Sequence, residues 1–249
     1  MDGSGRKKIA VVGKGNVGTH LFKAFSNTCN TLLIDSRTLD NLDWDSDLVL
    51  IAVSDDAIKE VAKALSQKLR GFNGIIAHTA GSVGMCVLKE YFPRYGVFYP
   101  LQTFSKHKSE MAYHDIPVFL EGSDSKVLEI LKDYASHVSE NIYEVDSMQR
   151  MKIHIASVFA CNFANSLYDI ASEILNDQEV PFSLLLPLIH ETVDKLSYLP
   201  PKESQTGPAV RNDTNVIKKH LDALSSTPEF KDIYNILSTY IINRHSPKN

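Results

Sequence analysis

The stretch KIAVVGKGNVGTHL, residues 8–21, decides the fold of this chain. Its apolar run, residues 8–12, is typical of a buried parallel strand and ends abruptly at a glycine. Gly13, Gly15 and Gly18 have G-x-G-x-x-G spacing, and residues 16–26 then show the periodicity of a helix. A strand, a glycine loop and a helix in this order predict the start of a dinucleotide-binding βαβ unit.

Each glycine of such a loop has its own physical role. The first permits a tight turn out of the strand, the second lets the backbone approach a pyrophosphate, and the third permits close packing of helix on strand. The N-terminus of the helix then attracts phosphate through its exposed N–H groups and its dipole. We therefore expect the cofactor to be bound by Gly13, Gly15, Asn16, Val17 and Gly18.

The pattern that begins at this loop continues to about Val145. Further strands are predicted at 31–34, 47–53, 74–79, 116–120 and 141–145, and helices at 57–69 and 125–138. This alternation predicts an α/β fold with a doubly wound parallel sheet of the Rossmann type. Ligands of such sheets bind beyond the carboxyl ends of the strands, so Val53, Ser54, Asp55 and Thr79 are further candidates for cofactor binding.

After Val145 the sequence predicts helices alone. They are expected over 148–176, 180–198, 215–225 and 228–243. Pro187 lies inside the second of them and should kink or break it. We place a domain boundary near Asp146, which gives a Rossmann domain over 1–146 and an all-helical C-terminal domain over 147–249.

The composition excludes several classes of function. The chain has 249 residues, is 43% hydrophobic and 22% charged, and carries a net charge of −4, which is typical of a soluble globular protein. It has no basic block for nucleic acid and no apolar run near the roughly 20 residues of a membrane span. Its three cysteines lie far apart and match no metal spacing. We expect free thiols in the reducing cytoplasm, no metal, and neither a nucleic-acid nor a membrane partner.

The end of the second predicted strand bears on the choice of dinucleotide. Asp35 stands where an acid accepts hydrogen bonds from the adenosine ribose, which favours NAD. Ser36 and Arg37 follow at once and could instead hold a ribose 2′-phosphate, which favours NADP. The two interpretations compete, because Asp35 would repel that phosphate.

Hydride transfer usually requires a proton donor or acceptor beside the nicotinamide. His78 ends an otherwise apolar strand and His154 lies on the long helix, so both are candidate catalytic residues. At about 100° per residue, His154 and Asn162 share a broad face of that helix, and Asn162 is a candidate to bind the substrate oxygen. For each of them a purely structural role is the alternative.

Candidate substrate-binding residues come from three further segments: Gly81, Ser82, Gln102 and Arg211. Gly81 and Ser82 follow a predicted strand at the edge where ligands bind. Arg211 has the charge to bind a substrate carboxylate. The alternative for Arg211 is a structural loop, in which Asp213 caps the next helix and Arg211 pairs with it.

Six blocks of sequence, in order, carry a resemblance to a known family: GKGNVG at 13–18, AVSDDAI at 52–58, HTAGS at 78–82, YPLQTF at 99–104, KIHIASVFACN at 152–162 and TGPAVRND at 206–213. Nearly the whole chain resembles the Rossmann-like, NADP-dependent oxidoreductases of unassigned substrate. These are relatives of β-hydroxyacid dehydrogenases, pyrroline-carboxylate reductases and prephenate dehydrogenases.

The resemblance implies a Rossmann domain followed by a helical domain, a homodimer through the helices, and an active site in the cleft between the domains. It also implies that His154 takes the place of a lysine that donates a proton in the related dehydrogenases. The chain departs from the family twice. Tyr99 stands where histidine is common, and Asp35 stands where a small or aromatic residue is common.

The sequence thus predicts an NADP-dependent oxidoreductase, with NAD as the other option. Its reaction would transfer hydride between nicotinamide and a small polar metabolite, a hydroxy acid, keto acid or imine. The alternative is a non-catalytic sensor or scaffold protein that binds dinucleotide. The presence of Tyr99 in place of a histidine favours this alternative. A nucleotide-dependent transferase is a third option, since fold alone determines no chemistry.

Overall fold

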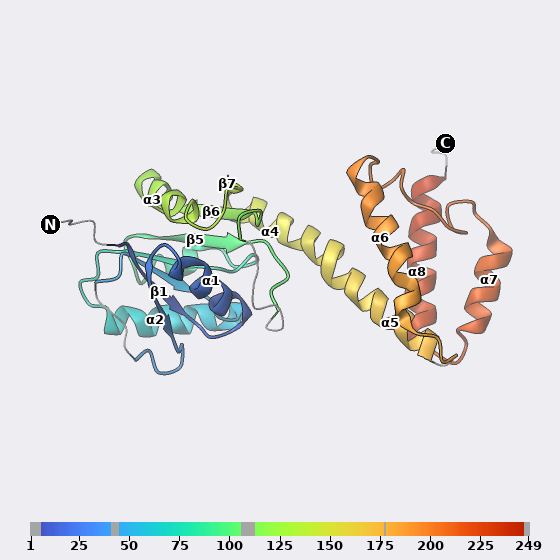
Figure 1. Cartoon of the computed structure of the whole chain (residues 1–249), viewed down its shortest axis with the longest axis horizontal. Coiled ribbons are helices and arrows are strands. Elements are labelled where there is room, and N and C mark those ends of the chain that lie inside the picture. The colour runs from blue at the N-terminus through green and yellow to red at the C-terminus, as the bar shows by residue number, and fades with distance from the viewer. Residues whose placement is uncertain (1–5, 41–44, 106–112, 177, 247–249) are drawn as a thin grey trace. The chain divides into compact units, whose positions relative to one another are not determined.

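The computed structural model describes residues 6–40, 45–105, 113–176 and 178–246. The chain divides into two compact units, Met1–Asn162 and Phe163–Asn249. The first contains a β-sheet with covering helices, and the described part of the second consists of helices and loops (Figure 1). The division falls after Asn162 and not near Asp146, because helix α4 (Ser147–Ser157) is held on the sheet by a buried arginine.

One sheet runs through the first unit, in the strand order β2-β1-β3-β4-β5-β6-β7. The strands are β1 (Lys8–Val12), β2 (Asn30–Ile34), β3 (Leu48–Ile51), β4 (Ile75–His78), β5 (Tyr95–Pro100), β6 (Val118–Gly122) and β7 (Ile142–Glu144). All neighbouring pairs are parallel except β5 and β6, which are antiparallel. The prediction of a Rossmann sheet followed by a helical region is confirmed.

Strand β5 is missing from the sequence-based prediction. Its residues, YGVFYP, follow Pro93 and end in Pro100, and proline is uncommon inside sheets because it lacks an N–H donor. Pro100 is tolerated here because it is the last residue of the strand, paired with Val118 at the start of β6. The added strand also accounts for the one antiparallel pairing, which the alternation of strands and helices does not predict.

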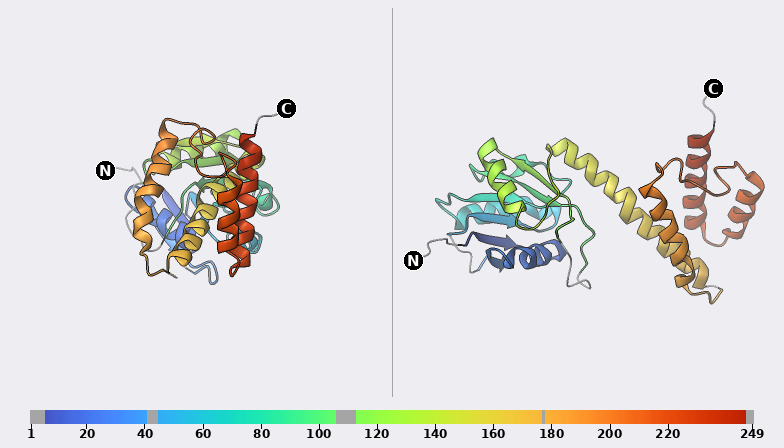
Figure 2. Two further views of the ribbon diagram at one scale, coloured as in Figure 1. Left: turned by 90° about the vertical axis from the view of Figure 1, so that its right-hand side faces the viewer. Right: turned by 45° about the horizontal axis from the view of Figure 1, so that its top comes forward.

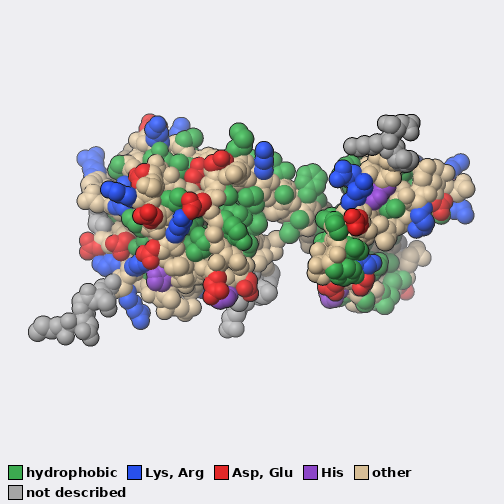
Figure 3. Space-filling view, turned by 90° about the horizontal axis from the view of Figure 1, so that it is seen from above, with side chains coloured by type: hydrophobic (Ala, Val, Ile, Leu, Met, Phe, Trp, Pro, Cys, Tyr) green, Lys and Arg blue, Asp and Glu red, His purple; other side chains and the backbone are tan. Residues whose placement is uncertain are grey.

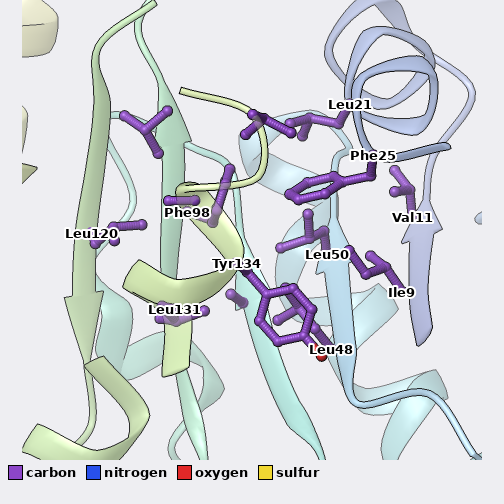
Figure 4. Close-up of a cluster of buried hydrophobic side chains, with 14 of the residues drawn as sticks. Ile9, Val11, Leu21, Phe25, Leu48, Leu50, Phe98, Leu120, Leu131 and Tyr134 are labelled. Carbon is purple, nitrogen blue, oxygen red and sulfur yellow. The ribbon is translucent and has the colours of Figure 1, made fainter. Parts of the chain in front are cut away.

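Helices cover both faces of the sheet (Figure 2). Helices α1 (Asn16–Ser26) and α3 (Ser125–Ala135) pack on one face, while α2 (Ile58–Lys68) and the short helix η2 (Met85–Leu88) pack on the other. Alternate strand residues point to opposite faces, so Ile9 joins the first core and Ala10 the second. Figure 4 shows Phe25 of α1 and Tyr134 of α3 among the strand side chains of the first core. Burying each large apolar side chain contributes about 1.5–3 kcal/mol.

A π-helical segment interrupts the long helix that the sequence predicts over 148–176. Helix α4 leads into η3 (Val158–Phe163) and then α5 (Ala164–Asn176). A π turn bonds residue i to i+5, so it changes the angular position of every later residue. The α-helical spacing that places His154 and Asn162 on one face therefore does not apply across η3.

The remaining helices lie close to their predicted positions. They are η1 (Asp55–Ala57), η4 (Phe182–Leu185), α6 (Leu186–Asp194), η5 (Lys195–Ser197), α7 (Thr214–Ala223) and α8 (Pro228–His245). Pro187 lies in the first turn of α6, where its missing N–H costs nothing, so that helix begins there and is not kinked. No helix in the described ranges is long and apolar enough to cross a membrane.

Arg150 holds the start of α4 on the sheet. It is completely buried, forms an ion pair with Glu121 of β6, and donates to the Val83 carbonyl oxygen at 2.6 Å. The Ser147 backbone N–H donates to Glu121 Oε1 at 3.1 Å. A buried charge is tolerated only with such partners, so the pair restricts where the helix can lie.

Candidate functional site

A cavity of about 940 Å³ opens at the carboxyl edge of the sheet. It is lined by Gly13, Lys14, Gly15, Asn16, Val17, Asp35, Ser36, Arg37, Ala52, Val53, Ser54, Ala57, Glu60, Val61 and Ala64. These residues follow β1, β2 and β3 or belong to α2 and its approach. The strand order reverses between β1 and β3, and this is the position at which doubly wound sheets bind ligands.

The glycine loop forms one wall of the cavity through two close approaches. Gly13 has φ +126°, and a Cβ there would overlap the Ala52 carbonyl oxygen. A Cβ at Gly18 would overlap the Gly13 carbonyl oxygen. At Gly15, by contrast, a Cβ would meet nothing within 4 Å, and no side chain caps the helix N-terminus that begins there. Gly13 and Gly18 are therefore needed for the fold, while Gly15 leaves the uncapped amides open to a phosphate.

Asp35 lies in the cavity between two cationic residues. Its Oδ1 accepts from the Arg37 backbone N–H at 3.0 Å, and Lys14 Nζ lies 3.6 Å from Oδ2. The hydrogen bond from Arg37 is the main cause that lowers the pKa of Asp35, and Lys14 lowers it further. The lining thus combines Lys14 and Arg37 with Asp35 and Glu60. Lys14 and Glu60 are missing from the sequence-based candidates. Lys14 occupies a position of the glycine motif at which any residue type is allowed, and Glu60 looks like an ordinary acidic residue on a helix surface.

Three candidate cofactor residues do not line the cavity. Gly18 lies behind the loop, against Gly13. Thr79 is buried, and its hydroxyl donates to the Ile51 carbonyl oxygen at 3.4 Å. Asp55 accepts a hydrogen bond from the Ser82 hydroxyl, which brings a candidate cofactor residue and a candidate substrate residue together.

His154 meets Gly81 and Tyr99 at the carboxyl ends of β4 and β5. The Tyr99 hydroxyl oxygen lies 3.0 Å from His154 Nδ1, and a Cβ on Gly81 would lie 2.7 Å from that nitrogen. Burial raises the pKa of Tyr99, so its phenol is protonated at neutral pH. The structure thus brings together two predicted site residues, His154 and Gly81, and adds Tyr99, whose contact the sequence does not reveal.

His78 is enclosed in the first unit with no exposed surface. Its Nδ1 accepts from the Ala80 backbone N–H at 3.2 Å. Burial, assisted by the positive charge of Arg150, lowers the pKa of His78 to about 3. An imidazole of so low a pKa that is enclosed by the fold does not take up a proton at neutral pH and is not accessible to a substrate, so the structure favours the structural role over the catalytic one.

The other candidates lie outside the cavity lining. Gln102 is exposed, and its side-chain oxygen accepts from the Thr103 backbone N–H at 2.8 Å. Asn162 is exposed in the π segment, and Arg211 is exposed in the second unit. Asp213 caps α7 by accepting a backbone N–H at 3.2 Å, which confirms the capping expected of it.

The family model described as a domain of unknown function, DUF2520, matches residues 116–241. A search of curated proteins finds no match. Among solved structures, a Bacteroides fragilis protein provisionally assigned as an NADP oxidoreductase is 35% identical, with a TM-score of 0.85, over 96% of this chain and 98% of that chain.

Two solved structures that are named as enzymes are similar in fold. A pyrroline-5-carboxylate reductase from Coxiella burnetii is 15% identical, with a TM-score of 0.55, over 96% of this chain and 97% of that chain. A prephenate dehydrogenase from Aquifex aeolicus is 15% identical, with a TM-score of 0.53, over 95% and 98%. At this identity the likeness shows a shared fold only.

The buried His78 predicts a specific dependence of stability on pH. Its folded-state pKa is about 3, against 6.5 when unfolded, so the unfolded chain binds the extra proton between these values. The contribution of His78 to the free energy of unfolding is fully present above pH 6.5 and is lost as pH falls toward 3, by up to about 5 kcal/mol. We expect His78→Gln to flatten the fall of the unfolding free energy across this window, as measured by urea denaturation.

His114→Gln is the matched control. His114 is exposed, and its hydrogen bond with Asp115 is the main cause that raises its pKa, so its contribution is lost as pH rises, not as it falls. The control should leave the acid slope of the wild type in place. Equal slopes for His78→Gln and the wild type would show that His78 is not held neutral by the fold.

Proposed function

The chain belongs to the DUF2520 family, and on that premise we propose that it is a nicotinamide-dinucleotide oxidoreductase that prefers NADP. The observation that carries the proposal is the cavity at the β1/β3 switch point, with an open glycine at an uncapped helix N-terminus. The residues present fit a dinucleotide. Gly15, Asn16 and Val17 would hold the pyrophosphate through backbone N–H groups.

NADP is preferred over NAD because of the charges at the end of β2. Arg37 and Ser36 line the cavity there, and Lys14 reaches the same carboxylate from the glycine loop. The two cationic side chains near this site would compensate the negative charge of a 2′-phosphate, even though the carboxylates of Asp35 and Glu60 would repel it. The 35%-identical relative is itself provisionally assigned to NADP, which supports this choice.

His154 is the proposed proton donor or acceptor. When bound, the nicotinamide supplies or removes a hydride, and a protein group must then move the accompanying proton. His154 is part-buried at the same carboxyl edge of the sheet as the glycine loop, beyond the ends of β4 and β5. The substrate would be a small hydroxy acid, keto acid or imine, with Gly81, Ser82, Gln102, Asn162 and Arg211 as proposed substrate-binding residues.

The second unit is proposed to form a homodimer with a second copy. Its buried residues, within the described ranges, are Ala209, Ile217 and Ser238. Its exposed large apolar side chains are Phe163, Leu167, Ile174, Leu184, Leu186, Leu188, Val193, Leu196, Tyr198, Ile233, Ile236, Leu237 and Tyr240. Figure 3 shows hydrophobic side chains open on the drawn face of this unit. A unit with so little core needs an apolar partner surface.

Gly15→Val tests the binding site directly. Gly15 lines the cavity where the pyrophosphate is proposed to lie, and a Cβ added there would meet no other atom within 4 Å. We expect unchanged cooperative unfolding and at least a roughly tenfold loss of NADPH affinity, measured by nicotinamide fluorescence. Gly84→Ala, whose Cβ would make ordinary contacts from 3.5 Å, is the control that should bind normally. Equal affinity for Gly15→Val and wild type would remove the loop from the proposal.

Arg37→Ala and Lys14→Ala test the preference for NADP. Loss of a charge-assisted hydrogen bond of about 1.5–3 kcal/mol should weaken the binding of NADPH roughly 10- to 100-fold and the binding of NADH much less. Arg94→Ala is a control of the same residue type, because Arg94 donates to the Asn73 carbonyl oxygen outside the cavity. Equal losses for both dinucleotides would contradict recognition of the 2′-phosphate. Binding without NADPH oxidation across a broad panel of keto acids and imines would instead favour the non-catalytic sensor.

Sedimentation velocity tests the homodimer. We expect the chain of 27.8 kDa to sediment as a dimer at micromolar concentration, and Ile236→Asp with Tyr240→Asp to convert it to a monomer. Lys219→Asp, on an exposed position of α7, should remain dimeric. A monomeric wild type at these concentrations would rule out the assembly.

A further inference from the structure

The carboxylate of Asp55 lies close to the proposed proton-transfer group, His154. The Ser82 hydroxyl donates a hydrogen bond to Asp55 Oδ2. Gly81, the residue before Ser82, packs against the His154 ring, since a Cβ added to this glycine would lie 2.7 Å from His154 Nδ1. One serine side chain thus separates the Asp55 carboxylate from the backbone that packs on the His154 ring.

The negative charge of Asp55 is not balanced by a neighbouring cation. Within the described ranges, Asp55 forms no ion pair with a lysine or an arginine. It follows Ser54, which lines the cavity, and it is exposed, so a ligand can approach its carboxylate. Burial is the main cause that raises the pKa of Tyr99, and the charge of Asp55 raises it further. The field of this carboxylate therefore reaches the phenol that contacts His154.

The cations nearest in sequence or in the cavity are placed elsewhere. Arg150 is completely buried in its ion pair with the sheet. Lys152 is exposed and stands two residues before His154, so it projects about 160° away from it around the helix axis. Lys14 and Arg37 line the cavity in the glycine loop and after β2. The first unit therefore presents a negative charge beside His154.

This charge distinguishes between two kinds of reacting group. Reduction of a carbonyl group develops negative charge on its oxygen, which a nearby carboxylate disfavours. An imine nitrogen can instead be protonated, and a nearby opposite charge favours the protonated form. Protonation also makes the imine carbon poorer in electrons and so a better acceptor of hydride. Asp55 thus favours reduction of a carbon–nitrogen bond over reduction of a carbon–oxygen bond.

We infer that Asp55 is a specificity-determining residue and that the group reduced at this site is a protonated imine. This inference rests on the proposed function and selects one of its substrate classes. In reduction, the His154 imidazolium gives a proton to the imine nitrogen, and the iminium carbon accepts a hydride from the dinucleotide. The electron pair of the C=N π bond becomes the lone pair of the amine, and oxidation of an amine is the reverse. Arg211 remains available for a carboxylate elsewhere in the substrate.

Binding measurements test the charge preference without turnover. Pyrrolidine is protonated at neutral pH and resembles protonated pyrroline, but it cannot accept a hydride, and cyclopentanol is its neutral counterpart. We expect the chain loaded with NADPH to bind pyrrolidine at least roughly tenfold more tightly than cyclopentanol, as measured by isothermal titration calorimetry. Asp55→Asn should remove this difference, and Asp55→Glu should keep it. Asp56→Asn is the matched control and should bind as the wild type does, because Asp56 is the exposed neighbour in the same short helix.

Turnover provides the second arm of the test. In the wild type, kcat/KM for NADPH-dependent reduction of pyrroline should exceed that for cyclopentanone at least roughly tenfold, and Asp55→Asn should lower the value for pyrroline alone. A chain that binds NADPH but binds pyrrolidine no better than cyclopentanol, or that keeps its preference in Asp55→Asn, would overturn this inference and leave the proposed function standing. A chain that does not bind NADPH would refute the proposed function and this inference together.

Discussion

The whole first unit depends on how closely the first turn of α1 approaches the ends of β1 and β3. Two glycines permit that approach, since a Cβ at Gly13 or Gly18 would overlap a backbone carbonyl oxygen. The neighbour across the contact, Ala52, is also small. Because the helix starts so near the strands, its uncapped amides open into the cavity between β1 and β3 and not into the core. The core and the site therefore follow from one packing constraint.

A second constraint places the proposed proton-transfer residue, His154, at the same edge of the sheet as the glycine loop. After β7 the chain leaves the sheet, yet Arg150 ties the start of α4 back to Glu121 and Val83. An ion pair this deeply buried contributes little net stability, but it strongly disfavours other placements of the helix. His154 consequently meets Tyr99, near the end of β5, and the proposed proton-transfer group lies at the edge that also carries the glycine loop.

Features encoded within a few consecutive residues were predictable, and features made by distant segments were not. The bounds of β1 and α1 match their prediction because an apolar run, three glycines and an amphipathic period are all local signals. Strand β5 has no such signal, since its aromatic run lies between prolines. The π turn in the long helix likewise leaves the apolar periodicity of the sequence recognisable, but it changes the angular position of the residues that follow it. These differences concern pairing and phase, which sequence periodicity does not specify.

The candidate site divides in the same way. Most of the predicted cofactor residues line the cavity because they follow strand ends, whereas Thr79, at the end of β4, is buried instead. His78 was a reasonable catalytic candidate by residue type, but its environment keeps it neutral. Arg150, Lys14 and Tyr99 gain their significance from partners far away in the sequence, so no pattern of neighbours could identify them.

The most direct test of this account is a crystal structure of the protein with NADP⁺ bound. Pyrophosphate oxygens should lie about 3 Å from the backbone N–H groups of residues 15–17, with the 2′-phosphate beside Arg37. A dinucleotide bound elsewhere, or one whose pyrophosphate makes no contact with the start of α1, would exclude the glycine loop as the cofactor site.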